Sequence, residues 1–277
     1  MLVTVRLAPS ALAASLAGVD TSRGHVTVRF GTPDDSWRVC ADLLADPAQF
    51  DRWRKDLATW LNEHYDGNIP DRTTAGYVLA WYLQVPAYLG AILFHTARRV
   101  PWLRPGDLAF RLSGDRPHPD GIALLSAGFV CLPEDPAAGT PEATVVRDEA
   151  ALAGVLRARF AGHAREFVAA YGPTTRLGRH MLWGAATDAL DSALWQTGRM
   201  LGDEGAGVAG AALVLPELIE PFTSPSRLYP VHGEGRTVWT RRRESCCFHF
   251  ALDGQTACAT CPRVSAAERE KRVLADS

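Results

Sequence analysis

The stretch of residues 75–94 constrains the fold most, because Gln84 is its only polar side chain apart from aromatic ones. A run of about 20 apolar residues is long enough to span a bilayer as a helix. Pro86 and Gly90 interrupt the run, however, and both suit a kinked helix that packs inside a protein. We therefore expect one buried core helix, or two helices that break at Pro86 and Gly90. Membrane insertion is the less favoured alternative.

Segments with helical or strand periodicity flank this run. Apolar side chains recur every three or four residues within 47–65, which predicts a helix with one buried face. Residues 25–30 alternate in polarity, which predicts a strand. By the same criteria, further helices are predicted at 37–44, 148–171, 176–201 and 211–219, and further strands at 109–112, 122–125, 129–132, 227–232 and 236–241. The last two strands flank the sequence Gly-Glu-Gly, which is typical of a β-hairpin turn.

Together these segments predict an α+β fold that is predominantly α-helical, with a helical body, short β-strands and hairpins, and a separate C-terminal segment. A loop at 133–141 contains several prolines and predicts a lobe boundary. We expect an N-terminal α+β lobe at 1–140, a helical lobe with the hairpin at 141–240, and a C-terminal segment at 241–265. This last stretch is called the cysteine segment below, because it holds four of the six cysteines.

Composition and charge exclude some classes of function. The chain has 277 residues and a formal net charge of −2, which gives no argument for binding nucleic acid, and we expect no nucleic-acid partner. The weakly apolar stretch 7–13 is interrupted by Pro9 and Ser10, so it predicts an opening helix rather than a secretory signal. The cysteines gather at one end instead of forming a disulfide framework, and thiolate ligands must stay reduced, which favours the cytoplasm.

Several motifs that could carry chemistry are absent or out of context. Residues 205–210 read Gly-Ala-Gly-Val-Ala-Gly, but a helix is predicted before them instead of a strand, so we expect a loop between helices and no dinucleotide site. No histidine pair has the spacing of a zinc protease, and no nucleophile-elbow sequence occurs. Asp188 and Asp191 share a helix face with Trp195, and we expect their carboxylates to be solvated or to have a capping role.

The cysteine segment carries the pattern Cys246-Cys247-(ten residues)-Cys258-(two residues)-Cys261. Four thiols this close in sequence can hold a zinc ion or an iron–sulfur cluster. The second pair fits a zinc knuckle, but the first does not, because adjacent side chains of extended backbone point apart. Two bridged irons spread four thiolates over a wider frame, which relaxes this difficulty. Spacing alone leaves both kinds of centre open.

The same pattern, with Arg242 and Arg243 before it and Pro262 after it, resembles the FhuF-like ferric-siderophore reductases. The resemblance covers about 243–262. In that family the four cysteines bind a [2Fe-2S] cluster, so the resemblance implies this cofactor. The implied metal ligands, which are also the cofactor-binding and catalytic residues, are Cys246, Cys247, Cys258 and Cys261.

A weaker resemblance lies in the predicted helix at 176–201. Trp183 and Gly184 match a Trp-Gly-Asn sequence of the family, but Ala185 replaces the asparagine. The arginines before the cysteines either offset the charge of a cluster, attract an anionic ferric complex, or form a solvated strand end. The candidate substrate contacts are therefore Trp183, Arg241, Arg242 and Arg243.

The resemblance implies a cytoplasmic [2Fe-2S] oxidoreductase that reduces a ferric siderophore by one-electron transfer. Siderophores hold ferric iron with hard oxygen donors, which bind ferrous iron more weakly, so one electron releases the metal. The implied partners are the ferric siderophore and an electron donor such as a ferredoxin or a flavin reductase, and peripheral membrane association is left open. Two other hypotheses remain: a non-enzymatic ligand-binding protein with a structural four-cysteine zinc site, and an iron–sulfur redox sensor. No DNA-binding element is evident, which disfavours the sensor.

Overall fold

The computed structural model describes residues 10–19, 26–31, 34–233 and 235–275. Parts of three predictions lie outside these residues: the start of the opening helix at 7–13, the first residue of the strand at 25–30, and the middle residue of the hairpin turn. The helices within the described residues are α1 (Ala11–Ala17), α2 (Cys40–Ala45), α3 (Ala48–His64), α4 (Asp71–Ala97), α5 (Glu149–Tyr171), α6 (Arg179–Met200), α7 (Glu204–Val214) and α8 (Ala266–Ala275). Three short 3-10 helices join them, η1 (Pro105–Asp107), η2 (Gly172–Thr174) and η3 (His249–Ala251).

The apolar run forms the middle of α4, which is one continuous helix. Pro86 lies inside it, and its cost of roughly 3 kcal/mol is outweighed by the burial of most of the helix's side chains. Gly90 allows α5 to approach, because a Cβ there would lie 2.7 Å from Cδ1 of Leu156. The expected core helix is confirmed, and a break at Pro86 and Gly90 is wrong. Among the described residues, α4 is the one helix long and apolar enough to cross a membrane, and 72% of its most apolar window is buried in the protein.

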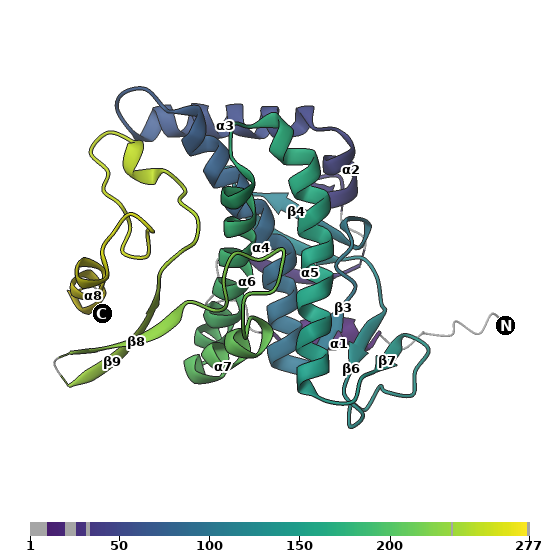
Figure 1. Cartoon of the computed structure of the whole chain (residues 1–277). Coiled ribbons are helices and arrows are strands. Elements are labelled where there is room, and N and C mark those ends of the chain that lie inside the picture. The colour runs from purple at the N-terminus through teal and green to yellow at the C-terminus, as the bar shows by residue number, and fades with distance from the viewer. Residues whose placement is uncertain (1–9, 20–25, 32–33, 234, 276–277) are drawn as a thin grey trace.

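The helical body consists of α4, α5 and α6 standing side by side, with α3 across their upper ends (Figure 1). Their packing leaves one continuous cluster of buried apolar side chains, from Leu12 in α1 to Leu252 in the cysteine segment. The cluster includes residues on both sides of the loop at 133–141. That loop therefore joins two parts of one core, and the division of the chain at 140 stays a prediction.

Short strands form small sheets around the helices. The described strands are β1 (Thr27–Phe30), β2 (Trp37–Val39), β3 (Arg99–Pro101), β4 (Leu108–Leu112), β5 (Pro119–Leu124), β6 (Phe129–Cys131), β7 (Ala143–Val145), β8 (Leu228–Gly233) and β9 (Arg236–Arg241). The first sheet has the order β1-β5-β4-β2, with β1 parallel to β5 and the other pairs antiparallel. The second has the order β3-β6-β7, and β8 and β9 form the predicted hairpin. The fold is thus α+β and predominantly α-helical, as expected.

Two local predictions are wrong. Residues 37–44 form β2 followed by α2, because β2 pairs with β4. The glycine-rich stretch 205–210 lies within α7, not in a loop. Asp203 caps this helix by accepting a hydrogen bond from the Ala206 N–H. The glycines serve close packing against α6, because a Cβ on Gly198 would lie 2.5 Å from Cα of Gly207.

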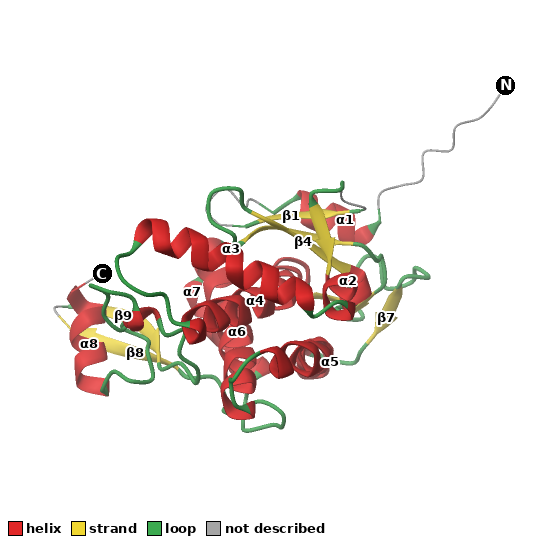
Figure 2. Cartoon of the chain, turned by 90° about the horizontal axis from the view of Figure 1, so that it is seen from above, coloured by secondary structure: helices red, strands yellow, loops and turns green. Residues whose placement is uncertain are grey.

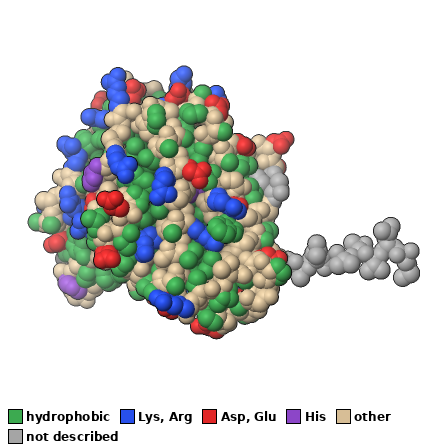
Figure 3. Space-filling view, turned by 45° about the vertical axis from the view of Figure 1, so that its right-hand side comes forward, with side chains coloured by type: hydrophobic (Ala, Val, Ile, Leu, Met, Phe, Trp, Pro, Cys, Tyr) green, Lys and Arg blue, Asp and Glu red, His purple; other side chains and the backbone are tan. Residues whose placement is uncertain are grey.

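The hairpin, the cysteine segment and α8 lie to one side of the helical body. Figure 2 shows this from above, with β8, β9 and α8 beside the α4–α6 bundle. On the face drawn in Figure 3, basic and acidic side chains lie interspersed among apolar ones. The cysteines and arginines predicted from sequence to be functional therefore lie at one margin of the molecule, next to α4 and α6.

Candidate metal centre

The cysteine segment follows β9 as a loop that is broken only by η3. It closes on itself where the Arg243 N–H donates to the Thr260 carbonyl at 2.9 Å. It lies against two glycines of the body. A Cβ on Gly76 of α4 would lie 3.1 Å from the Cys247 carbonyl oxygen, and one on Gly184 of α6 would lie 3.2 Å from the Glu244 carbonyl oxygen. These two glycines let the segment approach the helices closely.

The four cysteines line one small hollow. The Sγ atoms of Cys246 and Cys261 are 3.6 Å apart, near the roughly 3.8 Å expected for two thiolates on one tetrahedral ion with bonds of about 2.3 Å. Cys261 is buried, Cys258 is exposed, and the adjacent pair is half-buried. Within the described residues, no three His, Cys, Asp or Glu side chains are arranged to hold a single ion. All four cysteines nevertheless line the same hollow, so the segment offers four thiolates to one metal centre.

Hydrogen-bond donors already approach two of these sulfurs. The Phe248 N–H donates to Cys246 Sγ at 3.4 Å, and the hydroxyl of Thr260 lies 3.7 Å from Cys258 Sγ. Such donors stabilise thiolates that ligate iron. Burial raises the pKa of the Cys246 thiol to about 12, and the nearby Cys261 adds to this rise. The hydrogen bond from the Phe248 N–H acts in the opposite direction and lowers the pKa. Cys246 must therefore lose a proton when a metal binds.

Arg243 supplies positive charge at the same hollow. Its side chain is only 15% exposed and its Nε lies 3.5 Å from Asp188 Oδ2, but this buried Nε makes no hydrogen bond within the described structure. Burial opposes its charge, yet Asp188 and the sulfurs of Cys247 and Cys258 together raise the pKa of the guanidinium. A buried cation beside these sulfurs, with an unpartnered N–H, suits a negatively charged thiolate cluster.

Asp188 of α6 anchors the start of the segment. Its carboxylate accepts hydrogen bonds from the backbone N–H groups of Glu244 and Ser245, at 2.9 and 2.8 Å, and from the Ser245 hydroxyl at 2.6 Å. Asp191 accepts from the Ser226 hydroxyl at 2.6 Å. Both carboxylates are buried, so the expectation that they are solvated is wrong. The sequence contained a signal for this burial, because the two aspartates lie three residues apart in an otherwise apolar helix. Buried carboxylates need hydrogen-bond or charge partners, which predicts an anchoring role.

The three arginines differ in position. Arg241 is buried, donates to the Asp188 carbonyl at 2.8 Å and lies 3.6 Å from Asp191 Oδ2, so its charge is engaged inside the protein, and its predicted substrate contact stays a prediction. A cation at this place is needed to balance two buried carboxylates. Arg242 is exposed, and Arg243 faces the cysteines. Contact of Arg242 or Arg243 with substrate stays a prediction.

Trp183 does not face the cysteine hollow. It is 3% exposed, and its ring packs edge-on against Phe222 at 6.4 Å. Its buried indole Nε1 has no hydrogen-bond partner within the described structure. Trp183 instead lines a separate hollow with Arg165 and Arg179, and its predicted substrate contact stays a prediction. Its neighbour Gly184, by contrast, meets the cysteine segment, so the matched Trp-Gly pair fixes backbone packing.

Two groups that sequence reasoning missed hold the segment from outside. Tyr77 of α4 shares a 2.7 Å hydrogen bond with His249 Nδ1, and His249 Nε2 lies 2.9 Å from Gln255 Oε1. Behind the segment, Arg269 of α8 is buried and donates to the Cys261 and Val264 carbonyls. The polar composition of the C-terminal tail concealed this helix, whose arginines satisfy carbonyl groups of an irregular loop.

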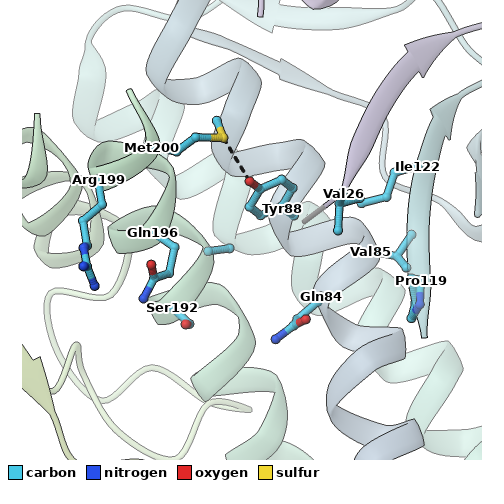
Figure 4. Close-up of a pocket in the computed structure, with 11 residues that line it drawn as sticks. Val26, Gln84, Val85, Tyr88, Pro119, Ile122, Ser192, Gln196, Arg199 and Met200 are labelled. Atoms are coloured by element: carbon cyan, nitrogen blue, oxygen red, sulfur yellow. Dashed lines mark hydrogen bonds between the residues drawn. The ribbon is translucent and has the colours of Figure 1, made fainter. Parts of the chain in front are cut away.

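Several larger hollows lie outside the cysteine site, and two of them are formed by α4 with neighbouring elements. The first, of about 440 Å³, lies between α4, α6 and the first sheet, and is called the α4–α6 hollow. Figure 4 shows Gln84 of α4 and Ser192, Gln196 and Arg199 of α6 around it. The second, of about 790 Å³, is called the basic hollow and is lined by Asp51, Arg54, Lys55, Ala58, Pro70, Asp71, Arg72, Thr74, Ala75, Pro173, Thr174, Thr175, Arg176 and Leu177.

Comparison with known proteins gives a structural match and a family match. No curated protein matches the chain. A solved structure described as aerobactin synthetase IucC from a hypervirulent pathotype of Klebsiella pneumoniae is similar, with 12% sequence identity and a TM-score of 0.44. The match covers 70% of this chain and 34% of that chain, so this chain spans about a third of that protein. A likeness at this level carries no argument.

The family match concerns the cysteine segment itself. Residues 243–263 match the model of the FhuF 2Fe-2S C-terminal domain. The match contains all four clustered cysteines and Arg243, the residues that the structure places around one hollow. It confirms the resemblance predicted from the cysteine spacing and names the cofactor. This segment is therefore similar to the FhuF 2Fe-2S C-terminal domain, and the cofactor that the match names is a [2Fe-2S] cluster.

Proposed function

We propose that the protein is an oxidoreductase that reduces ferric siderophores in the cytoplasm and so releases ferrous iron. The observation that carries this proposal is the gathering of Cys246, Cys247, Cys258 and Cys261 around one hollow, within the segment that matches the FhuF 2Fe-2S domain. When bound, the [2Fe-2S] cluster supplies one-electron transfer. Each ferric ion gains one electron, and an external donor such as a ferredoxin or a flavin reductase loses one.

The chain's own residues hold and shield the site. The four thiolates would ligate the cluster, and Arg243 balances part of their charge. Asp188 and Arg269 fix the backbone on either side of the cysteines. Cys258 is the exposed cysteine of the four, so the site is open to solvent on its side. The electron donor can therefore approach the sulfurs from that side.

The test is purification without air and without reconstitution. We expect red-brown protein with iron and acid-labile sulfide in near-equal amounts. After chemical reduction and removal of the reductant, it should release ferrous iron from a ferric siderophore, measured by a ferrous-specific chelator. Colourless protein with stoichiometric zinc would contradict the proposal and favour the zinc-closed binding protein. A normal cluster without any reduction would favour the redox sensor.

A further inference from the structure

The basic hollow lies beside the cysteine pair, on a neighbouring face of the same helical turns. Arg72 and Ala75 at the start of α4 line the hollow. Between them, the Thr73 hydroxyl donates to the Phe248 carbonyl at 3.3 Å. Gly76, the residue after Ala75, lies against the Cys247 backbone. A helix is about 10 Å across with its side chains. A ligand in the hollow is therefore separated from the cysteine pair by the first turns of one helix.

Arg72 joins the two places directly. Its guanidinium lies 5.6 Å from the ring centre of Phe248, the residue that follows the cysteine pair, and the same side chain lines the hollow. Such a cation–π contact at an exposed site is worth about 0.5–1 kcal/mol, so the side chain remains free to turn toward a ligand. The start of α4 thus presents one cation to both the hollow and the cysteine segment.

Positive charge is in excess in this hollow. Arg54, Lys55, Arg72 and Arg176 line it, against Asp51 and Asp71. Arg54 is committed to structure, because it binds Asp51 and donates to the Thr174 carbonyl and hydroxyl. The other three cations are exposed, and none makes an ion pair with another described residue. Charged groups of one sign that line a concave site raise the local concentration of ligands of the opposite sign.

The shape favours a small molecule over a protein. The volume of about 790 Å³ falls within the roughly 300–1,000 Å³ typical of ligand pockets. Its walls come from α3, the start of α4 and the loop 173–177, with threonine hydroxyls and small apolar side chains between the charges. An acidic electron-donor protein needs a broad and flatter surface.

The α4–α6 hollow is a weaker candidate for such a ligand. Its one cation, Arg199, lies 3.6 Å from Glu204 and 5.5 Å from the ring centre of Trp195, so its charge is already balanced. Gln84 lines this hollow. It follows Gly76, the contact point of the cysteine pair, by eight residues along α4, which is about 12 Å at 1.5 Å per residue. Amide and hydroxyl groups here suit a neutral ligand instead.

We propose that the basic hollow binds the ferric complex and that this complex carries a net negative charge. This inference rests on the proposed reductase function. Lys55, Arg72 and Arg176 attract the complex, and the first turns of α4 hold it beside Phe248 and the cysteine pair. Binding itself transfers no electron and changes no covalent bond in the ligand.

The test measures binding without turnover. Gallium(III) has the charge of ferric iron but accepts no electron under these conditions, so its complexes bind without being reduced. Isothermal titration of the air-oxidised holoprotein compares trianionic gallium tris-catecholate with cationic gallium desferrioxamine B. The test variant is Lys55→Gln/Arg72→Gln/Arg176→Gln. The control variant Arg29→Gln/Arg147→Gln/Arg199→Gln loses the same charge elsewhere and includes the cation of the α4–α6 hollow.

We expect tighter binding of the tris-catecholate, and a Kd roughly 10- to 100-fold higher in the test variant but nearly unchanged in the control. The visible spectrum of both variants should match the parent protein, which shows that the site and fold are intact. Binding of the anion should also weaken at high salt, where the Debye length falls to about 3 Å.

Other outcomes overturn the inference. Equal binding of both complexes, or equal losses in the two variants, would show that the basic hollow is not the site. The inference would also be overturned if the test variant lost binding to an acidic ferredoxin but kept its binding to the gallium complex. Neither result touches the proposed reductase function, which fails separately if reduced holoprotein releases no ferrous iron. Binding of the gallium anion without any reduction would retain the hollow as an anion site while refuting the reductase.

Discussion

The helical body and the cysteine segment differ in what holds each of them in place. In the body, fully buried rings such as Phe50, Tyr82 and Phe167 pack at centroid distances of 4.0–6.2 Å. In the segment, the buried apolar side chains among its residues are Leu252, Cys261 and Val264. Ordering a residue costs about 1–2 kcal/mol in backbone entropy, which so little burial does not offset.

The segment relies on polar anchors instead. Asp188 holds its start and Arg269 holds its end, and both are buried side chains supplied by neighbouring helices. A metal cluster that is ligated by four side chains of the segment would stabilise its folded conformation further. From this difference we expect the body to fold without the cofactor, and the order of the segment to depend on charge pairs and metal. Each prediction below tests one side of this difference.

The largest effect is expected from removing a ligand. Cys258→Ser removes one thiolate of four, so the protein should lose its visible absorption almost completely, since cluster assembly needs all the ligands. Hydrogen exchange of residues 243–263 should become fast, while α4 and α5 keep their protection. Cys131→Ser, at a buried cysteine of β6, serves as a control and should keep its colour. Loss of protection in the body of the Cys258→Ser protein would contradict the independence of the two regions.

The body should respond most to a cavity. Phe50 is 0% exposed and contacts the rings of Tyr82, Phe167 and Tyr171. Phe50→Ala should lower the free energy of unfolding by about 3–5 kcal/mol. Denaturant unfolding, followed by far-ultraviolet circular dichroism, measures this loss. Leu218→Ala, at a side chain that is 63% exposed, should change it by less than about 0.5 kcal/mol. An equal loss in both variants would show that the body does not depend on this core.

The polar anchor should matter locally. Asp188→Asn keeps the shape but removes the charge that balances Arg241 and Arg243, so we expect the segment to open more easily by about 3 kcal/mol. Hydrogen exchange at the Glu244 and Ser245 amides measures this directly. The matched variant Asp191→Asn, whose hydrogen bonds go to the loop at 226–227, should leave these two amides protected. If both variants behave alike, charge balance and not these hydrogen bonds anchors the segment.

A buried histidine makes the body sensitive to acid. Burial lowers the pKa of His163 to about 4, against the opposing influence of Leu103 and Asp107. The neutral ring donates from Nδ1 to the Leu103 carbonyl at 2.6 Å and accepts at Nε2 from the Tyr82 hydroxyl at 2.9 Å. In the unfolded chain its pKa is about 6.5, so the unfolded state takes up a proton that the folded state refuses.

Stability is therefore full above the unfolded pKa and falls as the pH drops through the window between the two values. From about pH 7.5 to about pH 5 the free energy of unfolding should fall by about 2 kcal/mol through this group. Unfolding curves of His163→Gln, compared with parent protein, isolate the contribution of this group because other titrating groups cancel. His180→Gln, at an exposed histidine of α6, is the control and should keep the parental slope. Equal slopes in the parent and His163→Gln would contradict the assignment.

The sequence by itself determined the features that depend on local pattern. The spacing of Cys246, Cys247, Cys258 and Cys261 predicted a four-thiolate centre and carried the family resemblance that implied the [2Fe-2S] cluster, because ligand spacing is a property of the chain. The helices at α3, α5 and α6, the β8–β9 hairpin and the apolar α4 also followed from periodicity and turn residues. These signals depend on neighbours within a few positions, which a linear reading contains.

Only the tertiary structure decided which side chains meet. Asp188 and Ser245 are 57 residues apart in sequence, and nothing local indicates that one anchors the other. Arg241 and Arg243 are near neighbours, yet the first is buried against carboxylates and the second faces sulfur. The glycines of α7 resembled a loop until their packing against α6 was visible. The basic hollow is built from three separate segments, because charges far apart in sequence come together only when helices pack.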